Sequence, residues 1–189
     1  NTPFHRTPPS LPSDDASADM QEQIEALLEE NGYEHYETSA FCKPNSQARH
    51  NINYWQFGDY LGIGAGAHSK LSYHDKITRE TRHKSPKAFM ENAENGSATD
   101  NIWTLAQTDL GFEFMMNALR LTSGFDAKLF AERTGMPWKA PVVNNMAMRV
   151  AEAQNKGLIE TSLNQGSNHI KPTLLGQRYL NNLLELFLN

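Results

Sequence analysis

Cysteine is almost absent from this chain of 189 residues, which contains only Cys42. A single thiol excludes an internal disulfide framework, and it cannot supply the several thiolates of an iron–sulfur cluster. It fits a protein of a reducing compartment, so we expect a cytoplasmic location.

Long hydrophobic runs are also missing. No stretch approaches the roughly 20 apolar residues of a membrane helix, and nothing resembles a signal peptide, so membrane contact is not expected. The formal net charge is −5 and the isoelectric point is near 5.8, which argues against nucleic-acid binding through whole-chain charge. A hydrophobic fraction of 39% still allows a packed core.

The N-terminal third predicts a helix followed by a strand. The first twelve residues contain four prolines, which argues against any helix there. Ser13 and Asp14 are caps for a helix over residues 15–30, in which the apolar side chains recur on one stripe and Asn31-Gly32 is the stop. Residues 33–41 are aromatic enough for a strand, giving one helix–strand step of a layered α/β fold.

The middle of the chain gives weaker signals. Residues 60–63 predict a short buried strand that runs into a glycine-rich turn. Residues 70–90 predict irregular structure with a short β segment around residues 76–81, and residues 91–101, rich in Asn, Gly and Ser, predict a linker or loop.

The C-terminal part reads as mostly helical. Helices are predicted near residues 112–121, over 127–133 with Asp126 as the cap, over 142–155, and over 175–187. Residues 158–160 and 169–171 flank a Gly- and Asn-rich turn, which indicates a β-hairpin. Three helices, a hairpin wing and a closing helix predict a winged-helix-like module.

One candidate site lies in the string His50-Asn51-Ile52-Asn53-Tyr54-Trp55. A neutral imidazole can bind iron or zinc, neighbouring Asn and Tyr side chains can orient its ring, and the aromatics can stack on a flat macrocycle. The alternative is an ordinary hydrogen-bonded histidine beside aromatic residues.

A second candidate is Gly62-Ile63-Gly64-Ala65-Gly66-Ala67-His68. Closely spaced glycines let a ligand approach the backbone, but no convincing helix follows, which excludes a Rossmann site. Ligand contact and a tight packing turn both stay open.

A basic stretch, from Lys76 to Lys87, could hold propionates or phosphates or form a solvated face. The winged-helix-like end raises duplex DNA binding, but its third helix carries Glu152 beside Arg149 and Lys156, so we expect no nucleic-acid partner.

The string YETSAFCKPNSQARHNINYWQFGDYLGIGAGAHSKL resembles the HemW family closely, and the oxygen-independent coproporphyrinogen III oxidases more distantly. The opening NTPFHRTPPSLPSDD and the ends NKGLIE and KPTLLGQRYLNNLLELFL are similar to the same family, so the resemblance spans nearly the whole chain. It implies an α/β plus mostly α fold, namely the C-terminal portion of a partial radical-SAM (β/α) barrel (residues 1–90), a linker (91–111) and a winged-helix-like HemN C-terminal domain (112–189).

The resemblance implies a haem chaperone that passes haem or porphyrin to a receiving protein, with coproporphyrinogen oxidase activity as the alternative. The family's H-N-x-x-Y motif falls on His50, Asn51 and Tyr54, with His50 as the iron ligand. The segment of the oxidases that approaches S-adenosylmethionine matches Gly64, Ala65, Gly66, Ala67 and His68.

The chain departs from the family in lacking the C-x-x-x-C-x-x-C motif of the [4Fe–4S] cluster, which we expect upstream of Asn1. This piece alone should therefore be inactive as a radical-SAM enzyme. Because a cut barrel exposes a strand edge, we expect residues 33–41 to pair with another copy or to lie against the C-terminal domain.

Overall fold

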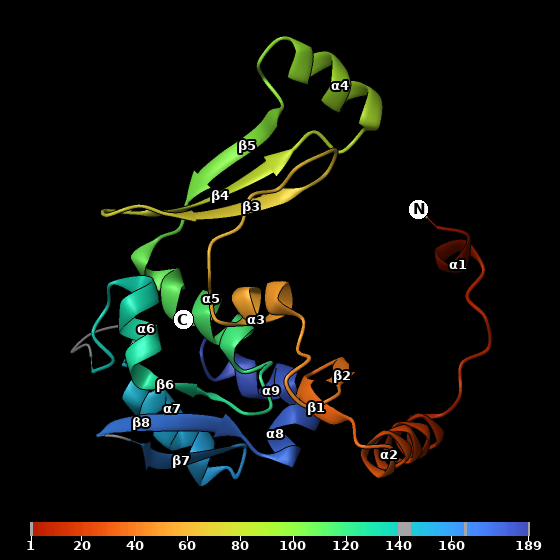
Figure 1. Cartoon of the computed structure of the whole chain (residues 1–189), viewed down its shortest axis with the longest axis vertical. Helices are drawn as coiled ribbons and strands as arrows, with labels where there is room; N and C mark the ends of the chain where they lie inside the picture. The colour runs from red at the N-terminus through yellow and green to blue at the C-terminus, as the bar shows by residue number, and fades with distance from the viewer. Residues whose placement is uncertain (1, 140–144, 165, 189) are drawn as a thin grey trace. The chain divides into compact units, whose positions relative to one another are not determined.

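The computed structural model describes residues 2–139, 145–164 and 166–188 and divides the chain into two compact units, 1–47 and 48–189 (Figure 1). The chain has mixed α/β structure, as the sequence predicts, and every strand pair that the structure describes is antiparallel. The domain boundaries predicted at residues 90 and 112 follow the family resemblance and stay predictions.

The first unit begins with a helical turn that sequence reasoning missed. α1 spans Pro3–Arg6, with Pro3 in its first turn and the Thr2 side chain accepting a hydrogen bond from the His5 N–H. The prediction of no helix was wrong, because a proline at the start of a helix loses no hydrogen bond and already has a helical φ.

The long helix α2 confirms its prediction and spans Asp14–Glu30. The Ser13 hydroxyl caps it by accepting from the Ala16 N–H, and Gly32 ends it in the left-handed conformation. Its predicted apolar stripe is exposed at Met20 and Ile24.

Residues 33–41 do not form one strand. β1 (Glu34–Glu37) and β2 (Ala40–Cys42) pair as an antiparallel hairpin, with Glu34 opposite Cys42. The polar pair Thr38-Ser39 reverses the chain, since short hydroxyl side chains stabilise turns. The expected helix–strand step is therefore a helix and a hairpin, and pairing with a second copy stays a prediction.

The second unit opens with the short helix α3 (Arg49–Trp55) and a three-stranded sheet of order β3-β4-β5. Its strands are β3 (His68–Ser72), β4 (Ile77–Arg82) and β5 (Thr99–Thr104), with α4 (Pro86–Glu94) between the last two. The expected irregular segment and the expected linker are thus largely regular structure. Asn95 and Gly96 form the short α4–β5 turn, where Gly96 has a positive φ, whereas Asn92 lies in α4 and Asn101 in β5.

Residues 60–63 form no buried strand. Tyr60 makes an isolated antiparallel bridge to Lys70, while Leu61 and Ile63 are exposed. Apolar composition alone suggested a buried strand, but the glycines turn the chain away after a single bridge.

The rest of the second unit has the predicted winged-helix-like topology. Helices α5 (Gln107–Ala118), α6 (Ala127–Thr134) and α7 (Met146–Asn155) accompany a sheet of order β6-β8-β7, formed by Phe125–Asp126, Ser167–Pro172 and Ile159–Asn164. Figure 1 shows this sheet at one end of the unit and the β3-β4-β5 sheet at the other. The predicted start of the third helix, at residue 142, lies outside the described residues.

The predicted closing helix is two helices, α8 (Leu174–Arg178) and α9 (Leu180–Glu185), which meet at Tyr179. Tyr179 leaves the helical region at φ −109° and ψ 42°, which interrupts the hydrogen-bond pattern. Leu183 and Phe187 are fully buried, so this end closes the core of the unit.

The core of the second unit surrounds Phe114 of α5. Its ring contacts Phe57, Phe125 and Phe130 edge to face, at centroid distances of 5.8, 5.2 and 5.2 Å. Edge-to-face pairs add to the stabilisation from burial. These contacts join α5, β6, α6 and the chain just after α3 into one body, and they fix the surface on which the candidate site lies.

Candidate functional site

Helix α3 carries all three residues of the predicted haem motif. His50 and Tyr54 are four residues apart and therefore share one helix face. Their ring centroids are 6.3 Å apart, with the rings nearly perpendicular. His50 is exposed, whereas Asn51 and Tyr54 are half-buried. The face thus offers an accessible imidazole beside an anchored phenol.

Tyr54 is anchored by a second tyrosine. Its ring contacts the Tyr60 ring edge to face, with centroids 4.6 Å apart. The Tyr60 hydroxyl accepts a hydrogen bond of 2.7 Å from the guanidinium of Arg79 on β4. Arg79 also pairs with Glu113 of α5 at 2.7 Å. A row of contacts therefore connects the His50 face with α5.

Other side chains of α3 are held by a loop carbonyl and by an arginine, and the chain just after the helix is held by the core. The Asn53 amide donates to the Asp59 carbonyl at 2.8 Å, and the Arg120 guanidinium lies 4.4 Å from the Trp55 ring centroid. Phe57, just after the helix, is buried against Phe114. These contacts fix the helix and thereby orient the face that carries His50.

A buried lysine fixes the segment that follows α3. The Lys70 side chain is 1% exposed, and its ammonium donates to the Phe57 carbonyl, to Asp59 Oδ1 and to the Ser72 hydroxyl at 2.9–3.0 Å. Because all three N–H donors of its ammonium group are used, Lys70 has a structural role and is not a free amine.

Lys70 and Asp59 shift each other's pKa. Burial lowers the pKa of Lys70 below its ordinary value, and the hydrogen bond from Lys70 to Asp59 offsets part of that effect. Burial alone would raise the pKa of Asp59, but hydrogen bonds from Lys70 and Ser72 outweigh it and lower the pKa. The ion pair of 2.9 Å therefore favours the charged form of each group, against the cost of burial.

The glycine-rich segment is a packed turn. The Gly66 N–H donates to the His83 carbonyl at 2.9 Å, and the Ala67 N–H donates to the Gly64 carbonyl at 3.3 Å. At Gly62, a Cβ atom would lie only 2.3 Å from the His68 carbonyl oxygen, so the close approach of two backbones requires glycine there. These contacts favour the packing turn over ligand contact at Gly64, Ala65, Gly66, Ala67 and His68, whose role toward S-adenosylmethionine stays a prediction.

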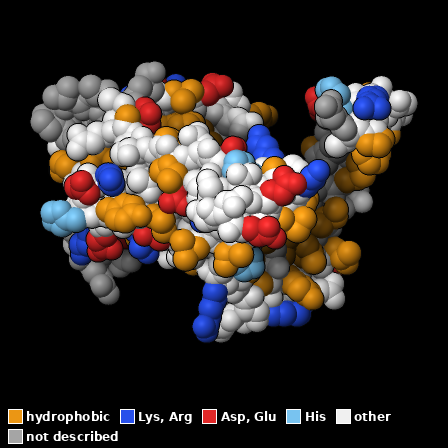
Figure 2. Space-filling view, turned by 90° about the horizontal axis from the view of Figure 1, so that it is seen from above, with side chains coloured by type: hydrophobic (Ala, Val, Ile, Leu, Met, Phe, Trp, Pro, Cys, Tyr) orange, Lys and Arg blue, Asp and Glu red, His pale blue; other side chains and the backbone are white. Residues whose placement is uncertain are grey.

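The basic stretch does not form one cationic patch. Arg79 and Arg82 pair with Glu113 and Glu80, and Lys87 pairs with Glu91. In the face seen in Figure 2, acidic and basic side chains are interspersed rather than grouped by sign. The stretch is therefore mostly paired, which fits neither a phosphate cradle nor a nucleic-acid surface.

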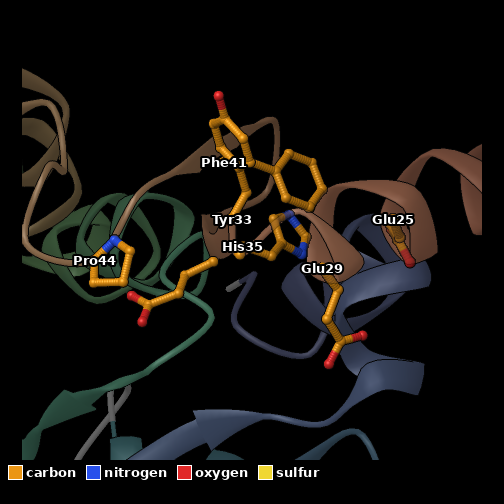
Figure 3. Close-up of a pocket in the computed structure, with 8 residues that line it drawn as sticks. Glu25, Glu29, Tyr33, His35, Phe41 and Pro44 are labelled. Carbon is orange, nitrogen blue, oxygen red and sulfur yellow. The ribbon is translucent and has the colours of Figure 1, made fainter.

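The first unit contains a pocket that sequence reasoning missed. A cavity of about 480 Å³ lies between α2 and the β1–β2 hairpin, with Glu25, Glu29, Tyr33 and His35 in its lining (Figure 3). The His35 ring stacks on Phe41, with centroids 4.4 Å apart. The aromatic composition of residues 33–41 predicted a single strand, so neither the hairpin nor the pocket beside it was predicted.

Clustered metal ligands are not found in the part of the chain that the structure describes, where no group of three or more His, Cys, Asp or Glu side chains could hold an ion. Cys42 is buried and free. In the same described residues, no helix combines the length and the apolar character needed to span a bilayer.

Comparisons with known proteins show which family and which relatives this chain matches. The HemN C-terminal domain family matches residues 105–178. The haem chaperones HemW of Escherichia coli and Haemophilus influenzae are 40% and 41% identical over 189 residues, which is 100% of this chain and 47% and 46% of theirs. The chain thus spans about half the length of the curated relatives it matches.

A solved structure agrees in fold. Coproporphyrinogen III oxidase HemN from Escherichia coli, described as a radical SAM enzyme, matches with a TM-score of 0.64 and 18% identity, over 94% of this chain and 42% of that one. The chain therefore shares the fold of HemN and belongs to the class of proteins that carry a HemN C-terminal domain. Within this class it belongs to the HemW family and corresponds to the C-terminal part of the family's proteins, as the sequence predicts.

Proposed function

We propose that this chain is the C-terminal part of a haem chaperone and that its α3 face takes part in binding haem. The observation that carries the proposal is the exposed His50 ring, one helical turn from the anchored Tyr54. The 40% identity to a haem chaperone over the whole chain supports the same function.

The residues of this face suit a porphyrin. The imidazole of His50 supplies a nitrogen ligand for iron, and an exposed ring can meet a flat macrocycle without first moving the core. Tyr54 adds an aromatic surface and a hydroxyl beside it, and Asn51 shapes the surroundings of the ligand. We assign His50 as the iron ligand, with Asn51 and Tyr54 as its neighbours.

The complete protein needs cluster ligands that this chain does not contain. A [4Fe–4S] cluster bound through three cysteines cannot form with Cys42 alone, so we assign the cluster and most of the S-adenosylmethionine site to the part of the family's length that this chain does not span. The bound haem would pass to a receiving protein in the cytoplasm. Oxidase activity has weaker support, because the oxidase likeness is one of fold.

The test is haem titration of the full chain and of His50→Ala. We expect the variant to bind haem at least about tenfold more weakly and to shift the Soret band, because it loses an iron ligand. His74→Ala, which removes an exposed histidine of the β3–β4 turn, is the matched control and should titrate like the wild type. An unchanged spectrum and affinity in His50→Ala would remove the proposal.

A further inference from the structure

Tyr60 lies where the candidate haem face meets the sheet. Its backbone N–H donates to the Lys70 carbonyl at 3.0 Å, and its carbonyl accepts from the Lys70 N–H at 3.1 Å. The backbone of Tyr60 is therefore fixed at the edge of β3. Its side chain reaches Tyr54, the aromatic residue next to His50.

Arg79 holds the other end of this side chain. Arg79 lies directly opposite Lys70 in the β3–β4 register, and Lys70 in turn bridges to Tyr60. Side chains opposite one another across a sheet share one face. One guanidinium nitrogen donates to the Tyr60 hydroxyl and another to Glu113, each at 2.7 Å.

The pair of Arg79 and Glu113 is sheltered, with side chains 16% and 23% exposed. A sheltered guanidinium needs its carboxylate, because an unpaired charge is costly there. The planar fork of arginine can hold a carboxylate and a hydroxyl at the same time in fixed directions. Glu113 therefore sets the position of Arg79, and Arg79 sets the position of Tyr60.

Glu113 belongs to α5, within the residues that match the HemN C-terminal domain. Helix α5 also contacts the chain just after α3, where Phe114 meets Phe57 in the core. Two independent contacts thus connect this domain with the helix that carries His50. One is apolar and buried, and the other is polar and ends on an aromatic ring.

We propose that Tyr60, held by Arg79 and Glu113, is a positioning residue for the haem face of α3. It holds the Tyr54 ring in one orientation and so presents His50 and Tyr54 as a preset surface. A preset surface loses less side-chain freedom when a porphyrin binds. The inference rests on the proposed haem function and extends it to three residues outside the H-N-x-x-Y string.

The test compares Tyr60→Phe and Glu113→Gln in the full chain. Each variant should weaken haem binding by about three- to tenfold, the effect of one lost hydrogen bond, and should move the Soret band. The double variant should lose little more than the stronger single variant, since both act through one hydroxyl. Tyr73→Phe, at an exposed tyrosine in the β3–β4 turn, is the matched control and should change neither quantity.

A second measurement needs no haem. In protein that carries fluorotyrosine, the ¹⁹F resonance of Tyr54, identified by its loss in Tyr54→Phe, should shift in Glu113→Gln but not in Tyr73→Phe. If the Tyr54 resonance does not shift in Glu113→Gln, the inference is overturned, whatever the haem result.

The two proposals can fail separately. If His50→Ala weakens haem binding while Tyr60→Phe and Glu113→Gln behave like Tyr73→Phe, the positioning role is overturned and the haem site stands. If His50→Ala binds haem normally, the haem site is lost and the positioning role with it.

Discussion

Single side chains connect the elements of the second unit through hydrogen bonds and ion pairs. Asp126 does so at the base of the wing, where it caps α6 by accepting from the Lys128 N–H at 2.8 Å and also accepts from the Ser167 hydroxyl of β8. Burial alone would raise the pKa of Asp126, but these hydrogen bonds and the nearby cations outweigh it and lower the pKa. The carboxylate form is therefore favoured in the folded state.

A pH-dependent stability follows from this residue. A lowered folded-state pKa stabilises the fold above the unfolded value of 3.8, and the contribution is lost as the pH falls through the folded value. Asp126→Asn keeps a good cap but removes the charge, so it should cost about 0.5–1 kcal/mol near neutral pH and progressively less below pH 3.8. Urea unfolding as a function of pH measures the difference.

Ser167→Ala provides the companion variant, because it removes one donor to the same carboxylate. It should reproduce part of the loss near neutral pH. A gap between wild type and Asp126→Asn that stays constant down to pH 2 would contradict the assignment.

At the scale of elements, α5 joins the core to the candidate site. One position of this helix is Glu113, which reaches Arg79, and the next is Phe114, which fills the centre of the core. Leu110 and Ala118, one turn before and after Phe114, are also buried. The helix therefore has a continuous apolar face, with a polar contact beside it.

Truncating a side chain on this apolar face should lower the free energy of unfolding substantially. Phe114→Ala removes a ring with 0% exposure that contacts three other rings, so we expect a loss of about 3–5 kcal/mol in the free energy of unfolding. Met116→Ala changes the exposed face of the same helix and should stay within about 0.5 kcal/mol. Chemical denaturation of both variants gives the comparison, and similar losses would contradict the assigned helix faces.

The elements that the sequence predicts correctly are those with a strong local signal. The span of α2 follows from its cap, its apolar stripe and Gly32, and the span of α6 follows from Asp126 and Gly135. The hairpin in residues 33–41 was missed because Thr38 and Ser39 also fit a strand. Residues 91–101 were predicted to be a linker because they are rich in Asn and Gly. The pairing of β5 with β4 is a long-range contact that this local composition does not indicate.

The candidate site was predictable only in part. A spacing of four residues places His50 and Tyr54 on one helix face, and this is local information. The contact of Tyr60, Arg79 and Glu113 joins residues 19 and 34 positions apart. It depends on the register of β3 with β4 and on the packing of α5, which periodicity does not reveal.

At the scale of the whole molecule, the two compact units differ in how much core they contain. The buried hydrophobic cluster runs from Phe57 to Phe187 and draws all of its described members from the second unit. The first unit buries few large side chains and leaves Ile24 and Leu27 of α2 exposed. The second unit therefore has the means to fold by itself.

We accordingly expect a polypeptide of residues 48–189 to fold alone. It should show a cooperative thermal transition and the near-UV circular dichroism of fixed aromatic rings, because its core is complete. It should also bind haem with the affinity of the full chain, since His50 and Tyr54 lie within it. A gradual, non-cooperative transition would show that the first unit is needed for the fold.

The burial of Lys70 has a consequence for chemical probing of this protein. Reagents that acylate amines need a free and accessible nitrogen, and the Lys70 nitrogen is enclosed by Phe57, Asp59 and Ser72. In a cross-linking map recorded by mass spectrometry, this lysine should remain unlabelled while exposed ones such as Lys87 react. Its first appearance among the labelled peptides would therefore report that the segment after α3 has opened.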